Sequence, residues 1–269
     1  MDKQPNKKVS IITIVLNGKQ YIEETILSVV NQKIVNLEYI IIDGGSTDGT
    51  LEIIEKYKSY THKVITGKDG GIYQAINKGL ALCTHSIVGI IHCGDHYTPN
   101  AISRVLKVVN KSDADVLYGD LEIREEYENS YILREEKSNH NLLKNHMSIF
   151  HPAAFVKLSV YRTIGGYNCD YKIASDYDLF LNMFINGYKF QYVPFCLASF
   201  RPGGISGQNF SLLLKETYLI KKNRIGVISA IFYLIYTIAI HLIYLSRKKI
   251  IISIIGKTNY LKMKQRRNK

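Results

Sequence analysis

Residues 86–99 read SIVGIIHCGDHYTP, a short apolar run that leads into a single acidic side chain. The run at 86–91 is rich in β-branched residues and does not alternate with polar ones, which is typical of a buried strand in a parallel sheet. Asp95 would then stand at the carboxyl end of that strand, where ligands bind in open α/β sheets. Asp and Gly are also common in ordinary turns, so this stretch alone allows either a turn or a ligand site.

Apolar runs and helical spacing alternate along the first 121 residues. The expected strands lie at residues 9–15, 38–42, 63–66, 86–91 and 115–121. The expected helices between them lie at residues 21–30, 51–57, 72–82 and 101–109. This alternation predicts an α/β fold with a doubly wound, mostly parallel sheet and helices on both of its faces.

The positive charge of the chain is concentrated near its C-terminal end. The formal net charge of the 269 residues is +12, and residues 221–269 contain twelve Lys or Arg and no Asp or Glu. The first 220 residues are left with 23 basic and 23 acidic side chains, so the body gives no reason to expect a nucleic-acid partner. No secretory signal is expected, because residues 1–8 are polar and the apolar run at 9–16 is short. The four cysteines lack metal-binding spacing and predict reduced thiols in a cytoplasmic body.

The second expected strand ends in IIIDGGSTDGT at residues 40–50. Asp43 follows the apolar run and could accept hydrogen bonds from a base or a ribose. The sequence contains no GxGxxG and no GxxxxGK[ST], so it supports neither a dinucleotide fingerprint nor a P-loop. Ser46 and Asp48 could also cap the following helix, and capping is compatible with a binding role.

Two acidic side chains stand at the start of another expected helix, in KIASDYDLFLNMFINGY at residues 172–188. Ser175, Asp176 and Asp178 directly precede an apolar helical pattern. The helix dipole favours ionised carboxylates in the first turn, which suits a general base. Helix capping by the same residues is the alternative interpretation.

Five ordered motifs together resemble the family 2 nucleotide-sugar glycosyltransferases with the GT-A fold, of the bacterial surface-polysaccharide type. The resemblance covers about residues 8–210. The motifs are VSIITIVLNGKQYIEETILSVVNQ at 9–32, EYIIIDGGSTDGTLEII at 38–54, KDGGIYQAINKGLALC at 68–83, IIHCGDHYTP at 90–99 and IASDYDLFLNMFINGYKF at 173–190.

The resemblance implies a role for each motif on the donor side. Asp95 would hold a divalent cation, Mg²⁺ or Mn²⁺, which neutralises the charge that develops on the leaving diphosphate. The family usually carries a pair of acids there, whereas this chain has Gly94 before Asp95, so the diphosphate and water would supply more of the ligands. His92 and His96 flank the site, where a turn or surface role is the simpler interpretation. The resemblance assigns the nucleotide-sugar donor to Thr13, Asn17, Asp43, Asp69, Gly71 and Asn77.

On the acceptor side, the resemblance implies that Asp176 is the catalytic base, with Ser175 in place of the usual Glu. Weaker acceptor or loop positions are His151, Asp178, Gly203 and Gly204. The implied reaction is inverting transfer of a sugar from the donor to a hydroxyl of a glycan or a polyprenyl-linked acceptor in polysaccharide biosynthesis. It belongs to the hexosyltransferase type.

Two alternatives stay open at the level of sequence. A nucleotidyltransferase that makes sugar nucleotides would need a glycine-rich loop with Lys or Arg near the N-terminus, and TIVLNGKQY at 13–21 is a poor one. A noncatalytic, membrane-tethered binding module would tolerate the loss of both Asp95 and Asp176.

The segment at 225–246 is uncharged and apolar, and it is long enough to span a bilayer. Basic residues flank both of its ends, and its polar side chains fall within an arc of roughly 140° on a helix. The stripe consists of Ser229, Tyr233, Tyr236, Thr237, His241 and Tyr244. This stripe favours a helix that lies in the membrane interface or against the body. We therefore expect a GT-A domain at 1–220 and a basic, apolar, membrane-associating segment at 221–269, with peripheral attachment to the inner face of the cytoplasmic membrane.

Overall fold

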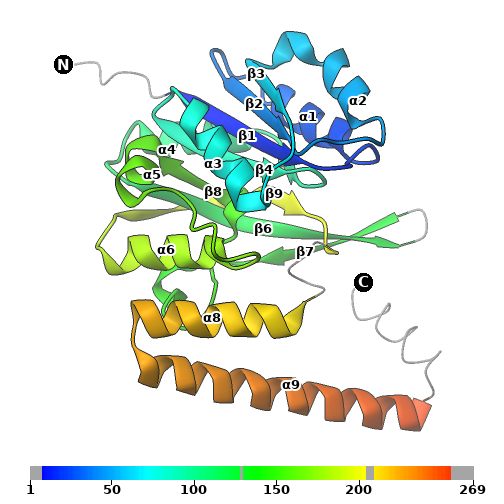
Figure 1. The fold of residues 1–269 in the computed structure, drawn as a ribbon, viewed down its shortest axis with the longest axis vertical. Helices are drawn as coiled ribbons and strands as arrows, with labels where there is room; N and C mark the ends of the chain where they lie inside the picture. The colour runs from blue at the N-terminus through cyan, green and yellow to red at the C-terminus, as the bar shows by residue number, and fades with distance from the viewer. Residues whose placement is uncertain (1–7, 128–129, 204–208, 256–269) are drawn as a thin grey trace.

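The structure is a computed structural model that describes residues 8–127, 130–203 and 209–255 (Figure 1). Its strands are β1 Val9–Val15, β2 Glu38–Asp43, β3 Lys63–Thr66, β4 Ile87–His92, β5 His96–Tyr97, β6 Val116–Tyr127, β7 Ser130–Glu136, β8 Ala154–Lys157 and β9 Phe190–Phe200. Its α-helices are α1 Ile22–Val30, α2 Thr50–Lys56, α3 Ile72–Leu82, α4 Ala101–Val109, α5 Leu158–Ile164, α6 Ser175–Ile185, α8 Phe210–Arg224 and α9 Val227–Ile255. Short 3-10 helices are η1 Lys58–Tyr60, η2 His140–Leu142 and η3 His151–Ala153.

One sheet carries all these strands in the order β3-β2-β1-β4-β8-β6-β9-β5, with β7 paired to β6. The pairs β2-β3, β1-β2, β1-β4 and β6-β9 are parallel. Strand β8 runs antiparallel to both of its neighbours, so β4 and β6 point the same way. The expected α/β class with a mostly parallel sheet is confirmed. The chain runs from β1 outward to β3 and then returns to β4 on the other side of β1, which creates a topological switch point there.

The expected strands and helices of the first 121 residues are all present, with ends shifted by a residue or two. The exception is β6, which we expected to end at residue 121 and which continues to Tyr127. Beyond Leu121 it forms a long hairpin with β7 that the sequence pattern did not predict (Figure 1). Strands β1, β2 and β4 of the parallel half are buried along their whole length or nearly so, as their continuous apolar runs required, whereas the edge strand β3 is partly exposed.

Each strand sends alternate side chains into two separate cores. Ile12 and Ile40 pack with α3, α5 and α6 on one face of the sheet. Ile11 and Ile41 pack with α1, α2 and α4 on the other face. Helices therefore cover both faces, and the carboxyl ends of β1, β2 and β4 meet at one edge between them.

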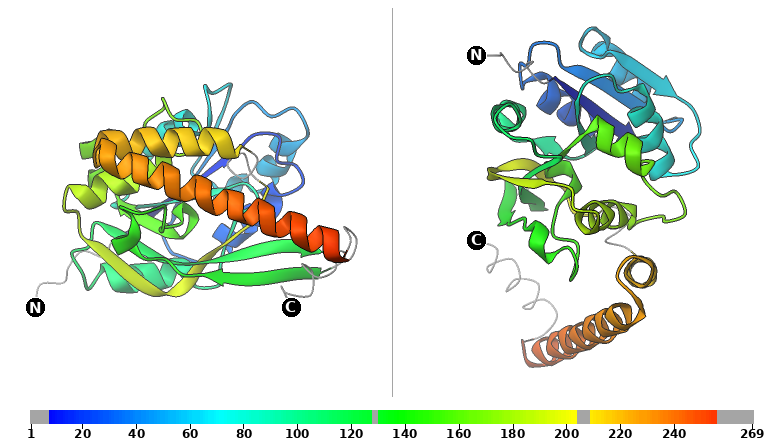
Figure 2. Two further views of the ribbon diagram at one scale, coloured as in Figure 1. Left: turned by 90° about the horizontal axis from the view of Figure 1, so that it is seen from below. Right: turned by 90° about the vertical axis from the view of Figure 1, so that its left-hand side faces the viewer.

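Helices α8 and α9 form two further layers beyond α6 (Figures 1 and 2). Helix α8 packs against α6, and α9 packs against the outer side of α8. The boundary that we expected between residues 220 and 221 falls inside α8. Within the part of the chain that the structure describes, no helix is both long and apolar enough to cross a membrane.

Candidate active site

The loop after β2 is built around the carboxylate of Asp43. The Asp43 side chain is fully buried, and its Oδ2 accepts hydrogen bonds from the backbone N–H groups of Gly45 and Ser46, both at 3.0 Å. Asn17 after β1 joins the same loop, because its N–H donates to Ser46 Oγ at 2.8 Å and its Oδ1 accepts from Thr47 N at 2.9 Å. Asp43 Oδ1 is buried and has no hydrogen-bond partner among the described residues. The structure thus brings Asn17 and Asp43 together at the switch point.

Thr13 is a different case from its neighbours in the first motif. It lies within β1, is fully buried, and forms a hydrogen bond of 3.0 Å with the hydroxyl of Tyr39. Unlike Oδ1 of Asp43, the side-chain oxygen of Thr13 has a partner in the core. We therefore assign Thr13 to the support of the β1-β2 pair, in place of the donor contact that we expected.

Asp69 and Gly71 lie in the loop between β3 and α3, at the edge of the sheet where the parallel strands end. Gly71 has a φ of +134°, a backbone conformation that favours glycine. Asp69 Oδ1 pairs with the ammonium group of Lys78, and Asp69 Oδ2 is buried without a hydrogen-bond partner among the described residues. Asn77 does not face the donor side as expected. Its amide donates to Tyr167 O at 2.8 Å and accepts from Tyr167 N at 2.9 Å, which fixes the loop before α6.

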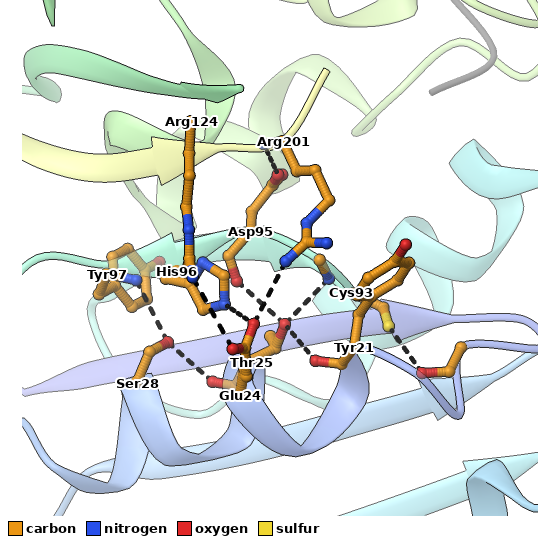
Figure 3. Close-up of polar contacts among 12 residues, drawn as sticks. Tyr21, Glu24, Thr25, Ser28, Cys93, Asp95, His96, Tyr97, Arg124 and Arg201 are labelled. Carbon is orange, nitrogen blue, oxygen red and sulfur yellow. Dashed lines mark hydrogen bonds and ion pairs between the residues drawn. The ribbon is translucent and has the colours of Figure 1, made fainter. Parts of the chain in front are cut away.

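Asp95 stands three residues beyond His92, the last residue of β4, as the opening motif predicted, and is 4% exposed (Figure 3). Its Oδ1 accepts a hydrogen bond of 3.2 Å from the backbone N–H of Arg201, the residue that follows β9. Its backbone carbonyl accepts from Thr25 Oγ1 of α1 at 3.0 Å. Burial raises the pKa of Asp95 to about 7. The preceding Gly94 has a φ of +102°, which explains why a glycine and not a second acid stands there.

A group of polar and charged side chains from three separate elements lies next to Asp95. Of Glu24, Arg201 and His96, sequence reasoning named only His96. Glu24 of α1 accepts from Arg201 Nη2 at 3.3 Å and from His96 Nε2 at 3.1 Å (Figure 3). The Arg201 guanidinium also lies 4.0 Å from the ring centroid of Tyr21. These contacts attach the end of β9 to α1 beside the buried carboxylate.

Asp176 lies in the first turn of α6, as predicted, with its side chain 25% exposed. Burial raises the pKa of Asp176 to about 6, and a hydrogen bond from Tyr177 N to Asp176 Oδ1 at 2.8 Å opposes that effect. Tyr73 of α3 accepts from Ser175 N at 3.1 Å. The carboxylate of Glu216 in α8 accepts from the backbone N–H groups of residues 172, 173 and 174 at 2.8, 3.0 and 3.0 Å. Neither Tyr73 nor Glu216 carried a local sequence signal for this role.

His151 reaches Asp176 from η3. Its Nδ1 lies 3.9 Å from Asp176 Oδ2, and its ring packs against the ring of His92 with a centroid distance of 4.4 Å. His92 ends β4, so the two histidines lie between the end of that strand and the start of α6. The expected position of His151 near the acceptor side is thus adjacent to the predicted base.

The other weaker acceptor or loop positions are Asp178, Gly203 and Gly204. Asp178 is 4% exposed, and both of its oxygens accept from the guanidinium group of Arg224 at 2.8 and 2.9 Å. This geometry is a structural ion pair between α6 and α8, and not the acceptor contact that we expected. Gly203 has a φ of +118° and lies in the loop after β9. Gly204 lies outside the described residues.

Comparison with known proteins places this geometry in a family. The model of "Glycosyl transferase family 2" matches residues 10–176, which reach from β1 to the predicted base. The chain belongs to glycosyl transferase family 2. It is therefore a glycosyltransferase that takes its sugar from a nucleotide-sugar donor, and residues beyond 176 lie outside the matched part of this family 2 protein.

Two curated relatives illustrate the range of the family. A PGL/p-HBAD biosynthesis glycosyltransferase of Mycobacterium bovis is 28% identical over 207 residues, which cover 73% of this chain and 78% of that protein. Chondroitin synthase of Pasteurella multocida is 28% identical over 185 residues, which cover 65% of this chain and 18% of that protein.

Solved structures share the fold of this family 2 chain. The mannosyltransferase PcManGT of Pyrobaculum calidifontis, in complex with GDP-Man and Mn²⁺, superposes with a TM-score of 0.64 at 17% identity, over 87% of this chain and 71% of that one. S. aureus TarS 1-349 in complex with UDP superposes with a TM-score of 0.62 at 18% identity, over 84% of this chain and 69% of that one. Both comparisons agree with the GT-A architecture described above.

Proposed function

We propose that this family 2 protein is a metal-dependent, inverting glycosyltransferase that acts on a hydroxyl of a glycan or a lipid-linked acceptor. The observation that carries the proposal is the environment of Asp176. Its carboxylate stands at a helix start, is partly exposed, and is fixed by backbone contacts on one oxygen only. A pKa of about 6 leaves it mostly ionised at neutral pH and close enough to neutrality to accept a proton.

The donor would lie along the edge formed by Asn17, Asp43 and Asp69. The unpartnered Oδ1 of Asp43 and Oδ2 of Asp69 are buried acceptors that need donors, and the hydroxyl and N–H groups of a nucleoside supply them. Structural neighbours were solved with UDP, UDP-GlcNAc and GDP-Man, so both uridine and guanosine nucleotides belong in a donor screen.

Asp95 fits a hard divalent cation, Mg²⁺ or Mn²⁺, that takes most of its ligands from the donor. Within the described residues, no group of three or more His, Cys, Asp and Glu side chains could hold a metal alone. Asp95 supplies one buried carboxylate, whose raised pKa an adjacent cation would lower again. The bound cation would neutralise the charge on the leaving diphosphate, and the neighbour solved with GDP-Man contains Mn²⁺.

The reaction follows from these positions. Asp176 accepts the proton of the acceptor hydroxyl, and the oxygen attacks the anomeric carbon from the face opposite the diphosphate. The new glycosidic bond forms as the bond to the nucleoside diphosphate breaks, so the configuration inverts. No protein nucleophile is needed for this single displacement.

The test is a screen of purified protein for nucleotide release from UDP- and GDP-sugars, with the anomeric configuration of the product read by NMR. We expect Asp176→Asn to keep donor binding and to lower turnover by about 10² or more, the usual effect of a lost general base. Asp95→Asn and excess EDTA should each abolish turnover. Asp170→Asn, an exposed acid in the same loop region, is the matched control. Pyrophosphate release from nucleoside triphosphates would instead support a nucleotidyltransferase.

We further propose that α9 attaches the protein to an anionic membrane surface, with the catalytic body on the cytoplasmic side. Part of the polar stripe faces the body: His241 stacks on Phe210 at 4.3 Å, and the ammonium of Lys221 lies 4.9 Å from the centroid of Tyr233. Ala230 is fully buried on the same side, whereas Tyr236 of the stripe is 67% exposed. The opposite face is apolar, with each side chain between 40% and 74% exposed. This face consists of Val227, Ile228, Ile231, Phe232, Ile235, Ile238, Leu242 and Ile243.

Charge complementarity supports anionic lipid as the occupant of this apolar face. The twelve basic and no acidic residues of 221–269 favour anionic lipid by about 1 kcal/mol for each basic residue near the surface. An apolar helix face inserted into the headgroup boundary adds hydrophobic burial, which salt does not screen.

Flotation with phosphatidylglycerol and phosphatidylcholine vesicles tests the attachment. We expect binding to anionic vesicles that high salt weakens only in part, and loss of binding in Phe232→Glu combined with Ile235→Glu. Leu133→Glu, which changes an exposed apolar residue on β7, should bind like the wild type. A dimer that these α9 changes dissociate, without lipid binding by the wild type, would overturn the proposal in favour of a second copy of the chain.

A further inference from the structure

Two histidines connect the halves of the site. His92 ends β4 and its carbonyl accepts a hydrogen bond of 3.0 Å from Asp95 N. His151 begins η3, and the two rings pack at a centroid distance of 4.4 Å with an interplanar angle of 51°. On its other side, His151 Nδ1 lies 3.9 Å from Asp176 Oδ2. The pair therefore joins the segment that carries the metal carboxylate to the segment that carries the base.

The environment keeps the ring of His151 neutral. Burial holds the pKa of His151 well below its usual range, and the neighbouring ring of His92 lowers it further. A neutral imidazole carries one N–H and one bare nitrogen, and the hydrogen-bond partners decide which nitrogen is which.

The surroundings of the two ring nitrogens of His151 are unequal. Nε2 is buried with no hydrogen-bond partner among the described residues, whereas Nδ1 faces the carboxylate of Asp176. A proton on Nε2 would leave a buried N–H without an acceptor and would direct the lone pair of Nδ1 at an anionic oxygen. A proton on Nδ1 provides a donor opposite that oxygen, so the Nδ1–H tautomer is favoured.

We infer that His151 is a positioning residue for the general base, with its Nδ1–H orienting Asp176 Oδ2 while the ring rests against His92. This inference depends on the proposed role of Asp176. The distance of 3.9 Å is beyond hydrogen-bond range, and a small side-chain movement closes it when an acceptor binds. Because Tyr177 N already holds Asp176 Oδ1 at 2.8 Å, the carboxylate would be fixed at both oxygens, and a lone pair of Oδ2 stays open for the acceptor proton.

Other titratable groups also act on Asp176. Tyr73 of α3 and Tyr167 of the loop before α6 stay neutral because burial raises their pKa values, and Glu216 of α8 raises the pKa of Asp176. Among these groups, His151 is the one inferred to direct a ring N–H at the carboxylate of Asp176. Substitution of His151 should therefore change kcat and the acid limb of the pH profile.

The matched variants are His151→Asn and His151→Gln. The amide nitrogen of Asn superposes on Nδ1 and that of Gln on Nε2, so both introduce the same group at different positions. On the full chain, with whichever UDP- or GDP-sugar the screen selects, we expect kcat of the Asn variant within about three-fold of wild type. The Gln and Ala variants should lose about ten-fold or more in kcat at unchanged donor KM, as for one lost hydrogen bond to a charged group. His146→Ala, an exposed histidine, is the control.

The pH profile separates positioning from mere structural support. Loss of the donor destabilises the ionised carboxylate, so the acid limb of kcat should move to higher pH in the Gln and Ala variants and stay in place in the Asn variant. Equal rates for the Asn and Gln variants, or an unmoved acid limb in the Ala variant, would overturn the inference.

A second measurement does not depend on turnover. In ¹⁵N-histidine-labelled protein, the cross-peaks that disappear in His151→Asn identify the His151 ring and report its tautomer. The Nδ1–H pattern supports the inference and the Nε2–H pattern overturns it. Absence of turnover with every donor would count against the proposed function, while this spectrum would still decide the orientation of His151.

Discussion

The carboxylate of Glu216 connects the start of α6 to α8. Its removal should displace the proposed base, Asp176, although Glu216 accepts its hydrogen bonds from the residues before it. Glu216 is 5% exposed and accepts the three backbone N–H groups of residues 172–174, immediately before Ser175 and Asp176. Glu216→Gln keeps the shape of the side chain, but its NH₂ group must face at least one of these donors. A hydrogen bond to a charged group contributes about 1.5–3 kcal/mol, so we expect the Gln variant to lose about 2 kcal/mol of unfolding free energy and the Ala variant about 4 kcal/mol.

The kinetic effect should fall on the chemical step. Because the proposed donor edge is formed by the loops after β1, β2 and β3, we expect donor KM of the Glu216 variants within about two-fold of wild type and kcat lower by about ten-fold. Urea unfolding and nucleotide release measure the two effects, with Glu52→Gln on the exposed side of α2 as the control. If both variants lost under about 0.5 kcal/mol, or if KM rose while kcat stayed constant, the reasoning about this contact would be refuted.

Two further changes have opposite effects on stability. Asp178→Asn removes the partner of a bidentate, largely buried Arg224 and should lower the unfolding free energy by about 3 kcal/mol with kcat preserved, as urea unfolding and a rate assay can check. Asp176→Asn should raise the melting temperature at pH 8. The folded pKa of Asp176 is raised to about 6, so its contribution to stability is present at low pH and is lost as the pH rises through the folded value. The gain should shrink toward pH 4 in thermal melts, and a pH-independent gain would contradict this assignment.

The sequence predicted the parallel half of the sheet because its signal is local. Continuous apolar runs become strands that are buried on both faces, and the helices between them have the spacing that covers those faces. The hairpin of β6 and β7 has no such signal, since residues 122–127 are mostly charged or polar. Pairing with β7, which follows directly, and with β9, which lies far along the chain, stabilises this part of β6.

The predicted site residues also divide into those with a local sequence signal and those whose direction depends on contacts in the fold. Asp43, Asp95 and Asp176 each follow a pattern that fixes their place at a strand end or a helix start, and the structure brings all three to the expected ends. Thr13 and Asn77 were inferred from motif position, which does not say where a side chain points. Their hydrogen bonds to other parts of the core decide that direction, and these contacts arise only in the folded chain.

The residues that sequence reasoning missed share one property, which is that they act across large separations in the chain. Glu216 holds backbone groups more than forty residues earlier. Arg224 likewise pairs with Asp178 from beyond the part of the chain that the family model matches. The segment that carries the proposed base is therefore held by α8 as far as Arg224. We therefore propose that the division between the body and the membrane-attaching segment lies at the turn into α9, around Gly226, where the left-handed backbone ends one helix before the next begins.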